Sequence, residues 1–174
     1  MKKLFLLLIT TSFVFLNSDA QNPWELGVEY QRSIGQGFSD HIGGVRYESF
    51  SGKGSFSVGI QYQFSSKKSY SVSKGYALYA GYRYAFGKIT TGNNPFIGAR
   101  VRFSLQNFEG KTSLNSLLIT PSAEAGYHFV FAKRIAAAPY LGYGYTLKLS
   151  KDYNSLDEDV GTRFLPGISA SYRF

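Results

Sequence analysis

An alternation of apolar and polar residues with a period of two recurs along the chain after Gln21, and no helical period of useful length interrupts it. In an extended strand this alternation places apolar side chains on one face and polar side chains on the other. We count about eight such segments, each close to or slightly longer than the ~9–11 residues of a tilted strand that crosses a bilayer. The segments contain, in order, Trp24, Val45, Phe56, Tyr76, Ile97, Leu117, Leu141 and Phe164. The pattern predicts an all-β protein.

The first twenty residues do not share the pattern. Met1, Lys2 and Lys3 form a short basic stretch, an apolar run follows from 4 to 16, and Ser18 and Ala20 occupy the small-residue positions of a cleavage site. This layout predicts a secretory signal peptide over residues 1–20, with a mature domain over 21–174. A membrane anchor is the alternative, but the apolar run is shorter than the ~20 residues that a spanning helix needs.

Composition agrees with strands and excludes thiol chemistry. Aromatic residues make up 17% of the chain and there are 19 glycines, which favours strands with close backbone approaches. Charged residues reach only 17%, against the usual ~25%. There is no cysteine, so the chain can form no disulfide.

Two kinds of connection alternate between the predicted strands. Residues 50–55, 86–94 and 131–134 are mostly tight, whereas 33–40, 65–75, 107–115 and 150–161 are longer and polar. Short turns at one rim and longer loops at the other are typical of an up-and-down transmembrane β-barrel. A secreted soluble barrel would show the same alternation, so the two faces have to distinguish the two classes.

The polar face is crowded with small residues such as Gly59, Ala136 and Gly144, while the apolar face carries no charge in its central stretches. An eight-stranded barrel has an interior only just wide enough for side chains, and an uncharged outer face suits hydrocarbon. We therefore expect an antiparallel transmembrane barrel whose last strand pairs with its first. Two aromatic girdles are expected at the rims; the first comprises Trp24, Phe50, Phe56, Phe86, Phe96, Phe131 and Phe174, and the second Tyr30, Phe64, Tyr76, Phe103, Tyr145 and Phe164. Pro121, Pro139 and Pro166 fall on the apolar face, where we expect bulges or strand ends.

The chain ends on SASYRF, with an aromatic residue preceded by alternating apolar residues. With the signal peptide, the strand count and the alternating connections, this ending resembles the small eight-stranded outer-membrane barrels of OmpA/OmpX type over residues 21–174. The resemblance implies location in the bacterial outer membrane. Because the chain ends at the barrel, we expect a stand-alone barrel without the periplasmic domain of OmpA. The resemblance also implies that the outer-membrane assembly machinery reads the last strand through Ile168, Ala170, Tyr172 and Phe174.

Ionisable residues gather on the face that should line the barrel interior: Glu25, Glu29, Arg46, Glu48, Arg83, Arg100, Arg102, Glu124 and His128. Charges in a tight interior must pair or keep water. They can form a plug of salt bridges or line a gated path for small solutes. We favour the plug, because eight strands leave no open channel.

Enzymatic activity has weak support in the sequence. His128 shares a face with Glu124, and His41 stands beside Asp40 and Ser39, but neither set forms an evident triad. A lipid-A-modifying barrel is the alternative suggested by resemblance. We expect no catalytic residue, no cofactor and no metal, since the calcium-loop pattern is absent, and no nucleic-acid motif is present.

The predicted second loop is basic because it contains Lys67, Lys68 and Lys74. These residues either contact lipopolysaccharide phosphates or belong to an ordinary solvated loop. The sequence thus predicts a structural, accessory or surface-binding barrel, with a membrane-embedded enzyme or a narrow pore as alternatives. Its expected partners are outer-membrane lipid and lipopolysaccharide, the assembly machinery and a larger membrane-protein complex.

Overall fold

The computed structural model describes residues 22–35, 38–67, 72–87, 93–109, 114–149 and 160–174. The predicted signal peptide lies outside these residues, so the division at residue 20 stays a prediction. The described residues form eight strands: β1 Trp24–Gly35, β2 Phe38–Ser51, β3 Gly54–Lys67, β4 Val72–Ala85, β5 Asn94–Glu109, β6 Leu114–Phe131, β7 Ile135–Lys148 and β8 Gly161–Arg173. None of the described residues belongs to a helix that could cross a membrane.

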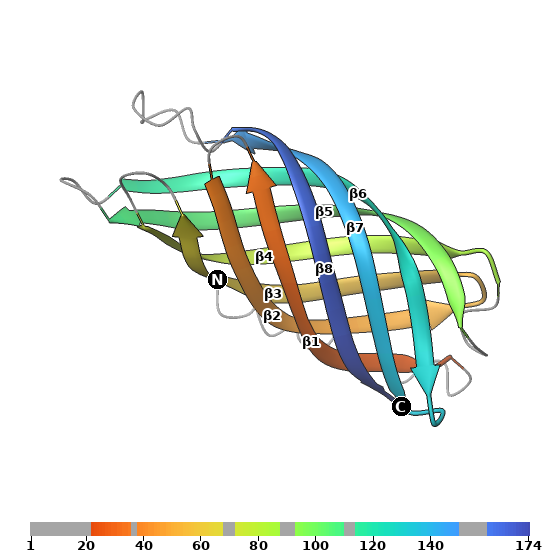
Figure 1. Cartoon of the computed structure of the whole chain (residues 1–174). Helices are drawn as coiled ribbons and strands as arrows, with labels where there is room; N and C mark the ends of the chain where they lie inside the picture. The colour runs from red at the N-terminus through yellow and green to blue at the C-terminus, as the bar shows by residue number, and fades with distance from the viewer. Residues whose placement is uncertain (1–21, 36–37, 68–71, 88–92, 110–113, 150–159) are drawn as a thin grey trace, which may run out of the picture.

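The strands close into one antiparallel barrel in chain order, with β8 paired to β1 (Figure 1). Closure leaves no strand edge with unpaired backbone groups. This confirms the predicted fold class, an eight-stranded up-and-down barrel. Figure 1 shows the last residue at one end of the barrel, beside the connection between β6 and β7. We call this the terminal end and the opposite one the distal end.

The connections differ from the prediction in length. β1 continues to Gly35 and β2 begins at Phe38, so the loop expected over 33–40 is mostly strand. Likewise β3 runs to Lys67 and β4 begins at Val72 within the loop expected over 65–75. Backbone pairing continues beyond the apolar stretches because ladder hydrogen bonds need no apolar side chain. Conversely, residues 86–93 separate β4 from β5, which makes this connection longer than a tight turn.

Side chains divide between the two faces as the alternation requires. Outward residues such as Leu78, at 60% exposure, and Leu141, at 59%, form an apolar belt around the barrel. Inward residues are buried and mostly polar, and they include Gln61, Arg83 and Thr120. A protein with an apolar exterior and a charged interior is suited to a hydrocarbon solvent.

The three prolines sit within strands, so the expectation of bulges or strand ends is wrong. Between β6 and β7, Ile119 pairs with Leu147 and Ser122 with Gly144, in the same register on both sides of Pro121. The pairs at Pro121 itself are missing from this ladder, although Pro121 pairs with Val101 on its other side.

The other two prolines repeat this arrangement. The β6–β7 ladder is interrupted again opposite Pro139, and the β1–β8 ladder opposite Pro166, while each proline keeps its pairing with the strand on its other side. Each proline therefore interrupts one ladder on one side, because it lacks an N–H group.

Candidate functional site

Glu29, in the middle of β1, is the centre of the interior. It is 3% exposed, and its carboxylate accepts hydrogen bonds from the Tyr79 hydroxyl at 2.8 Å and the Tyr140 hydroxyl at 2.8 Å. The amide of Gln61 donates to it at 3.0 Å, Arg100 forms a short ion pair with it, and Arg46 Nη1 lies 3.6 Å away. Groups from five other strands thus converge on one carboxylate.

Two further glutamates connect this centre to the neighbouring arginines. Arg46 Nη2 lies 2.5 Å from Glu48 Oε2, and the Ser55 hydroxyl donates to Glu48 at 2.6 Å. Arg83 and Arg100 both reach Glu124, with N–O distances of 2.5 and 3.1 Å. We define the central network as Glu29, Glu48, Glu124, Arg46, Arg83 and Arg100. Its three anions and three cations balance in charge, which lowers the penalty for burying them.

A separate charged cluster lies at the terminal end. Glu25 accepts from Arg173 Nε at 2.9 Å and from the Ser171 hydroxyl at 2.6 Å. His128 Nε2 lies 3.2 Å from the same carboxylate. The acid beside His128 is therefore Glu25 from β1, whereas Glu124, which the sequence placed beside it, is bound by arginines.

An apolar layer lies between these charged groups and was missed by the sequence reasoning. Phe50 and Phe96 are 0% and 1% exposed and pack with Ala85, Ala138 and Tyr140 inside the barrel. The prediction that both phenylalanines belong to the outer girdle is wrong. The alternation along each strand gives the reason, because residues an even number of positions apart share a face. Phe50 is two residues from inward Glu48, and Phe96 is four residues from inward Arg100.

Arginine side chains cover these rings. The guanidinium carbon of Arg83 lies 4.2 Å from the centre of the Phe96 ring, and that of Arg173 lies 5.1 Å from the centre of the Phe50 ring. Such stacking is favourable for a partly desolvated guanidinium. The apolar layer and the ion pairs therefore form one continuous filling.

The distal half of the interior is also polar, and Gln31 joins it to this filling by donating to the Tyr140 hydroxyl at 3.3 Å. Arg102, which the sequence grouped with the other interior charges, donates to Gln31 at 3.1 Å. Arg163 donates to Thr146 at 3.1 Å, and Thr146 shares a hydrogen bond of 2.9 Å with Thr120. This last pair lies beside Pro121, so a side-chain hydrogen bond bridges β6 and β7 where the backbone ladder is interrupted.

The candidate catalytic residues near His41 are divided between the two faces. Asp40 is buried in the interior, whereas His41 lies on the outer face and its Nδ1 is 2.6 Å from the Tyr30 hydroxyl. Ser39 accepts a hydrogen bond from Arg32 Nε at 2.7 Å. These contacts do not assemble an acid, a base and a nucleophile. In the part of the chain that the structure describes, no three His, Cys, Asp or Glu residues could hold a metal ion.

Comparison with known proteins bears on the fold. No protein-family model matches the chain, and no curated protein matches it in sequence. Among solved structures it is similar to the Neisserial surface protein A, with 14% identity and a TM-score of 0.61 over 87% of this chain and 95% of the other. The N-terminal β-barrel domain of Pseudomonas aeruginosa OprF gives 14% identity and a TM-score of 0.59, over 86% and 97%. For Ail of Yersinia pestis the identity is 13% and the TM-score 0.54, over 88% and 97%.

The chain has the fold of a small outer-membrane β-barrel. At these identities the likeness concerns fold alone, and it agrees with the fold implied by the resemblance to barrels of OmpA/OmpX type. In outer-membrane barrels the longer loops face the cell exterior, and the longest connection of this chain, from Lys148 of β7 to Gly161 of β8, lies at the distal end. The terminal end of this outer-membrane barrel is accordingly its periplasmic end, and the distal end faces the cell exterior.

The last strand of the outer-membrane barrel has the geometry expected of a closing strand. The outer face of this strand carries Ile168, Ala170, Tyr172 and Phe174. β8 pairs with β1 from Glu25↔Arg173 at the periplasmic end to Ile34↔Phe164 near the distal end. The Phe174 ring stacks on Trp24 with centroids 4.0 Å apart, and Phe174 N donates to Trp24 O at 2.9 Å. The role of these four residues as an assembly signal stays a prediction.

Of the three lysines expected in one loop, the structure describes the side chain of Lys74 alone. Lys74 is exposed and belongs to β4, and Lys67 is the last residue of β3. Lys68 lies outside the described residues. Arg32, which sequence reasoning did not select, is exposed near the distal end of β1 on the outer face.

Proposed function

We propose that this chain is an integral outer-membrane barrel with a plugged interior, serving a structural or surface-binding role without enzymatic activity. The observation that carries the proposal is the convergence of side chains from five strands on Glu29, above a layer of packed aromatic rings. An interior filled in this way supports a barrel that does not conduct, since eight strands leave little room.

Planar-bilayer recording tests the plug. We expect no conductance steps from the purified wild-type barrel. A variant combining Glu29→Ala, Phe50→Ala and Phe96→Ala removes the central carboxylate and both rings, and should give steps if it inserts. Phe56→Ala and Phe131→Ala, which change exposed aromatic residues of the outer face, serve as controls and should stay silent. Steady conductance from the wild type would contradict the plug.

The absence of catalysis is tested on the lipid itself. Mass spectrometry of lipid A from cells with and without the protein should give identical profiles. A new acyl or phosphate pattern that depends on the protein would identify an enzyme instead. His41→Ala would then show whether the histidine beside Tyr30 is responsible.

A surface role is supported by exposed cations near the distal end. Arg32 and Lys74 lie on the outer face there, at the level where lipopolysaccharide phosphates meet a barrel. We expect the double variant Arg32→Gln and Lys74→Gln to retain less lipopolysaccharide after detergent extraction than the wild type. Lys133→Gln, at the opposite end, is the matched control.

A further inference from the structure

The outer face of the barrel is hollowed over β4 to β8. The floor of this groove consists of the alanines Ala99, Ala123 and Ala125, whose side chains are too short to fill the belt. Its walls include Tyr82, Tyr143 and Phe164, and the hollow between them, open to the outside, has a volume of about 680 Å³. We call it the β4–β8 groove. Because the belt faces hydrocarbon, an apolar hollow in it is filled by something other than water.

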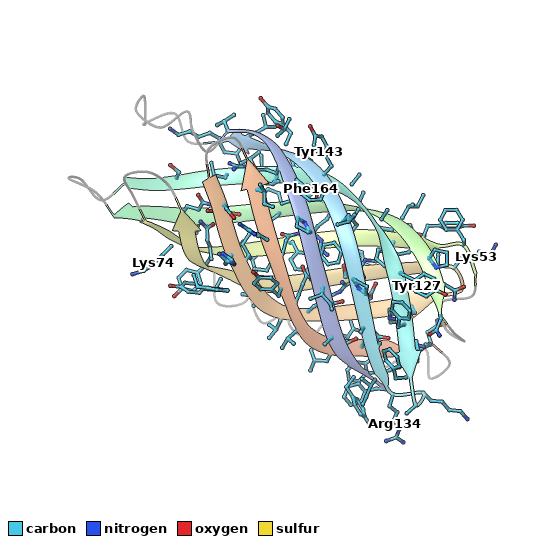
Figure 2. All side chains as sticks on the ribbon, viewed as in Figure 1. Lys53, Lys74, Tyr127, Arg134, Tyr143 and Phe164 are labelled. Atoms are coloured by element: carbon cyan, nitrogen blue, oxygen red, sulfur yellow. The ribbon has the colours of Figure 1, made fainter. Side chains whose placement is uncertain are left out.

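The register of the strands shows where the groove leads. One row of paired residues joins Tyr82, Ala99, Ala123, Tyr143 and Phe164 across five strands. This row starts three residues from the periplasmic end of β4 and finishes three residues from the distal end of β8. The groove therefore climbs obliquely from the periplasmic rim. In Figure 2, Lys53 lies at the periplasmic end of the barrel, and Tyr143 and Phe164 lie farther along it.

The periplasmic end of the groove carries hydrogen-bond donors. Ala85, the last residue of β4, donates its N–H to the carbonyl of Lys53 at 2.7 Å, which holds the backbone of this exposed lysine beside the periplasmic end of β4. The Tyr82 ring reaches the same turn, since a Cβ at Gly54 would lie 2.4 Å from its hydroxyl oxygen. An ammonium and a phenolic hydroxyl at the membrane interface suit a phosphate group.

The charge of the described surface has one sign. All acidic residues whose side chains the structure describes are buried in the interior: Glu25, Glu29, Asp40, Glu48 and Glu124. The exposed charged residues among the same described side chains are all basic: Arg32, Lys53, Lys74, Lys133 and Arg134. The periplasmic rim thus favours an anionic headgroup over a zwitterionic one.

We propose that the β4–β8 groove binds one anionic phospholipid of the periplasmic leaflet, with an acyl chain on the alanine floor and the phosphate at Lys53 and Tyr82. A flexible chain can follow an oblique floor between protruding rings. A second barrel or a flat strand would first have to clear Tyr82, Tyr143 and Phe164, so a lipid fits the shape better than a protein.

Native mass spectrometry of the folded barrel in detergent tests this directly, with dioleoylphosphatidylglycerol and dioleoylphosphatidylcholine added separately. The wild type should retain one phosphatidylglycerol in preference to phosphatidylcholine. Lys53→Gln should lower retention of phosphatidylglycerol about fivefold, as expected for one cation at a lipid surface. Lys74→Gln, near the distal end of β4, is the matched control and should leave the preference unchanged.

The floor is tested by Ala123→Leu, which fills the groove and should reduce retention of both lipids. Ala99→Leu provides a second filling variant, and the exposed turn position of Lys53 keeps the headgroup test independent of folding. Equal retention of the two lipids by the wild type would overturn the proposal. So would retention unaffected by either leucine, or a barrel dimer that either leucine abolishes. Lipid retention and conductance are measured separately. A barrel that conducts and still retains phosphatidylglycerol would therefore contradict the plugged interior and leave the lipid site standing.

Discussion

The ring of Tyr140 lies directly over Gly167, its paired residue on β8, so that a Cβ at Gly167 would come within 2.4 Å of the Tyr140 hydroxyl oxygen. Tyr79 lies over Gly59 of β3 in the same way, with its ring 2.4 Å from the position of a Cβ there. Both hydroxyls donate to Glu29. Glycine opposite an aromatic residue therefore lets each ring lie flat against the barrel wall and point to the central carboxylate.

The first prediction concerns these glycines. Gly167→Ala should destabilise the folded barrel by about 1–3 kcal/mol, because the added methyl group displaces the Tyr140 ring from its place. Urea unfolding in detergent micelles, followed by fluorescence, measures the change. Gly43→Ala is the control, since a Cβ there has its closest contact at 3.2 Å with Phe64. Equal stability of both variants and the wild type would show that the ring tolerates the shift.

Removing the central charge should have a larger effect. Glu29→Gln keeps the shape of the side chain but leaves the arginines of the central network with one anion fewer. Breaking a buried ion pair in this way typically costs about 3–5 kcal/mol, because a charge stays buried without compensation. Heat-modifiable migration on gels gives a direct measurement, with unfolding expected at a lower temperature. An unchanged unfolding temperature would show that the buried arginines do not depend on the Glu29 charge for stability.

The single tryptophan reports on the closing contact. Trp24 is the only tryptophan of the chain, and it stacks on Phe174. Phe174→Leu should alter the emission of Trp24 and destabilise the barrel by about 0.5–1.5 kcal/mol through loss of the ring pair. Deletion of Phe174 should in addition lower the amount of protein in the outer membrane while secretion continues. Normal outer-membrane levels would contradict the assembly role of the last strand.

The prolines predict a pattern of amide protection. Pro121→Ala introduces an N–H that can complete the β6–β7 ladder opposite Tyr145. A new hydrogen bond contributes about 0.5–1.5 kcal/mol, whereas loss of proline costs about 0.4–1 kcal/mol through the unfolded chain. The net stability should change little, yet hydrogen exchange should find the new amide protected. Rapid exchange of this amide would show that the missing N–H of proline is not what interrupts the β6–β7 ladder.

The turn between β6 and β7 is strained. Ala132 and Lys133 have φ angles of 48° and 64°, in the left-handed region that disfavours residues with a Cβ. Lys133→Gly should stabilise the barrel, since the left-handed strain of about 1–2 kcal/mol exceeds the entropy of the added glycine. Arg134→Gly is a useful contrast: Arg134 donates to the Tyr172 hydroxyl at 2.8 Å, and its loss should destabilise. Both changes can be measured by urea unfolding.

Strands and fold class were predictable from sequence because a two-residue period is local and repeats. The same parity identifies inward residues, and applied strictly it would also have placed Phe50 and Phe96 inside. Their prediction as girdle residues rests on their aromatic rings and their positions near strand ends, since aromatic residues are expected at membrane interfaces. Parity near a strand end carried more information than residue type.

Partners within the interior could not be predicted. Which acid faces His128 depends on the stagger between β1 and β6, which are not neighbours in the sheet. The sequence shows that Glu25 and Glu124 both point inward but not at which height each lies. The groove on the outer face was hidden for the same reason, because Ala99 and Ala123 become neighbours only through register.

The contact between Trp24 and Phe174 makes a circular permutation of the chain possible. The first and last described strands are hydrogen-bonded neighbours, and Phe174 N already bonds to Trp24 O. A short linker could therefore join these ends, and new ends could be opened at Gly52 and Lys53 between β2 and β3. Such a circular permutant would keep every strand pairing while moving the aromatic C-terminus away from its strand. It would separate the contribution of the last strand to barrel closure from the contribution of its free end to insertion into the outer membrane.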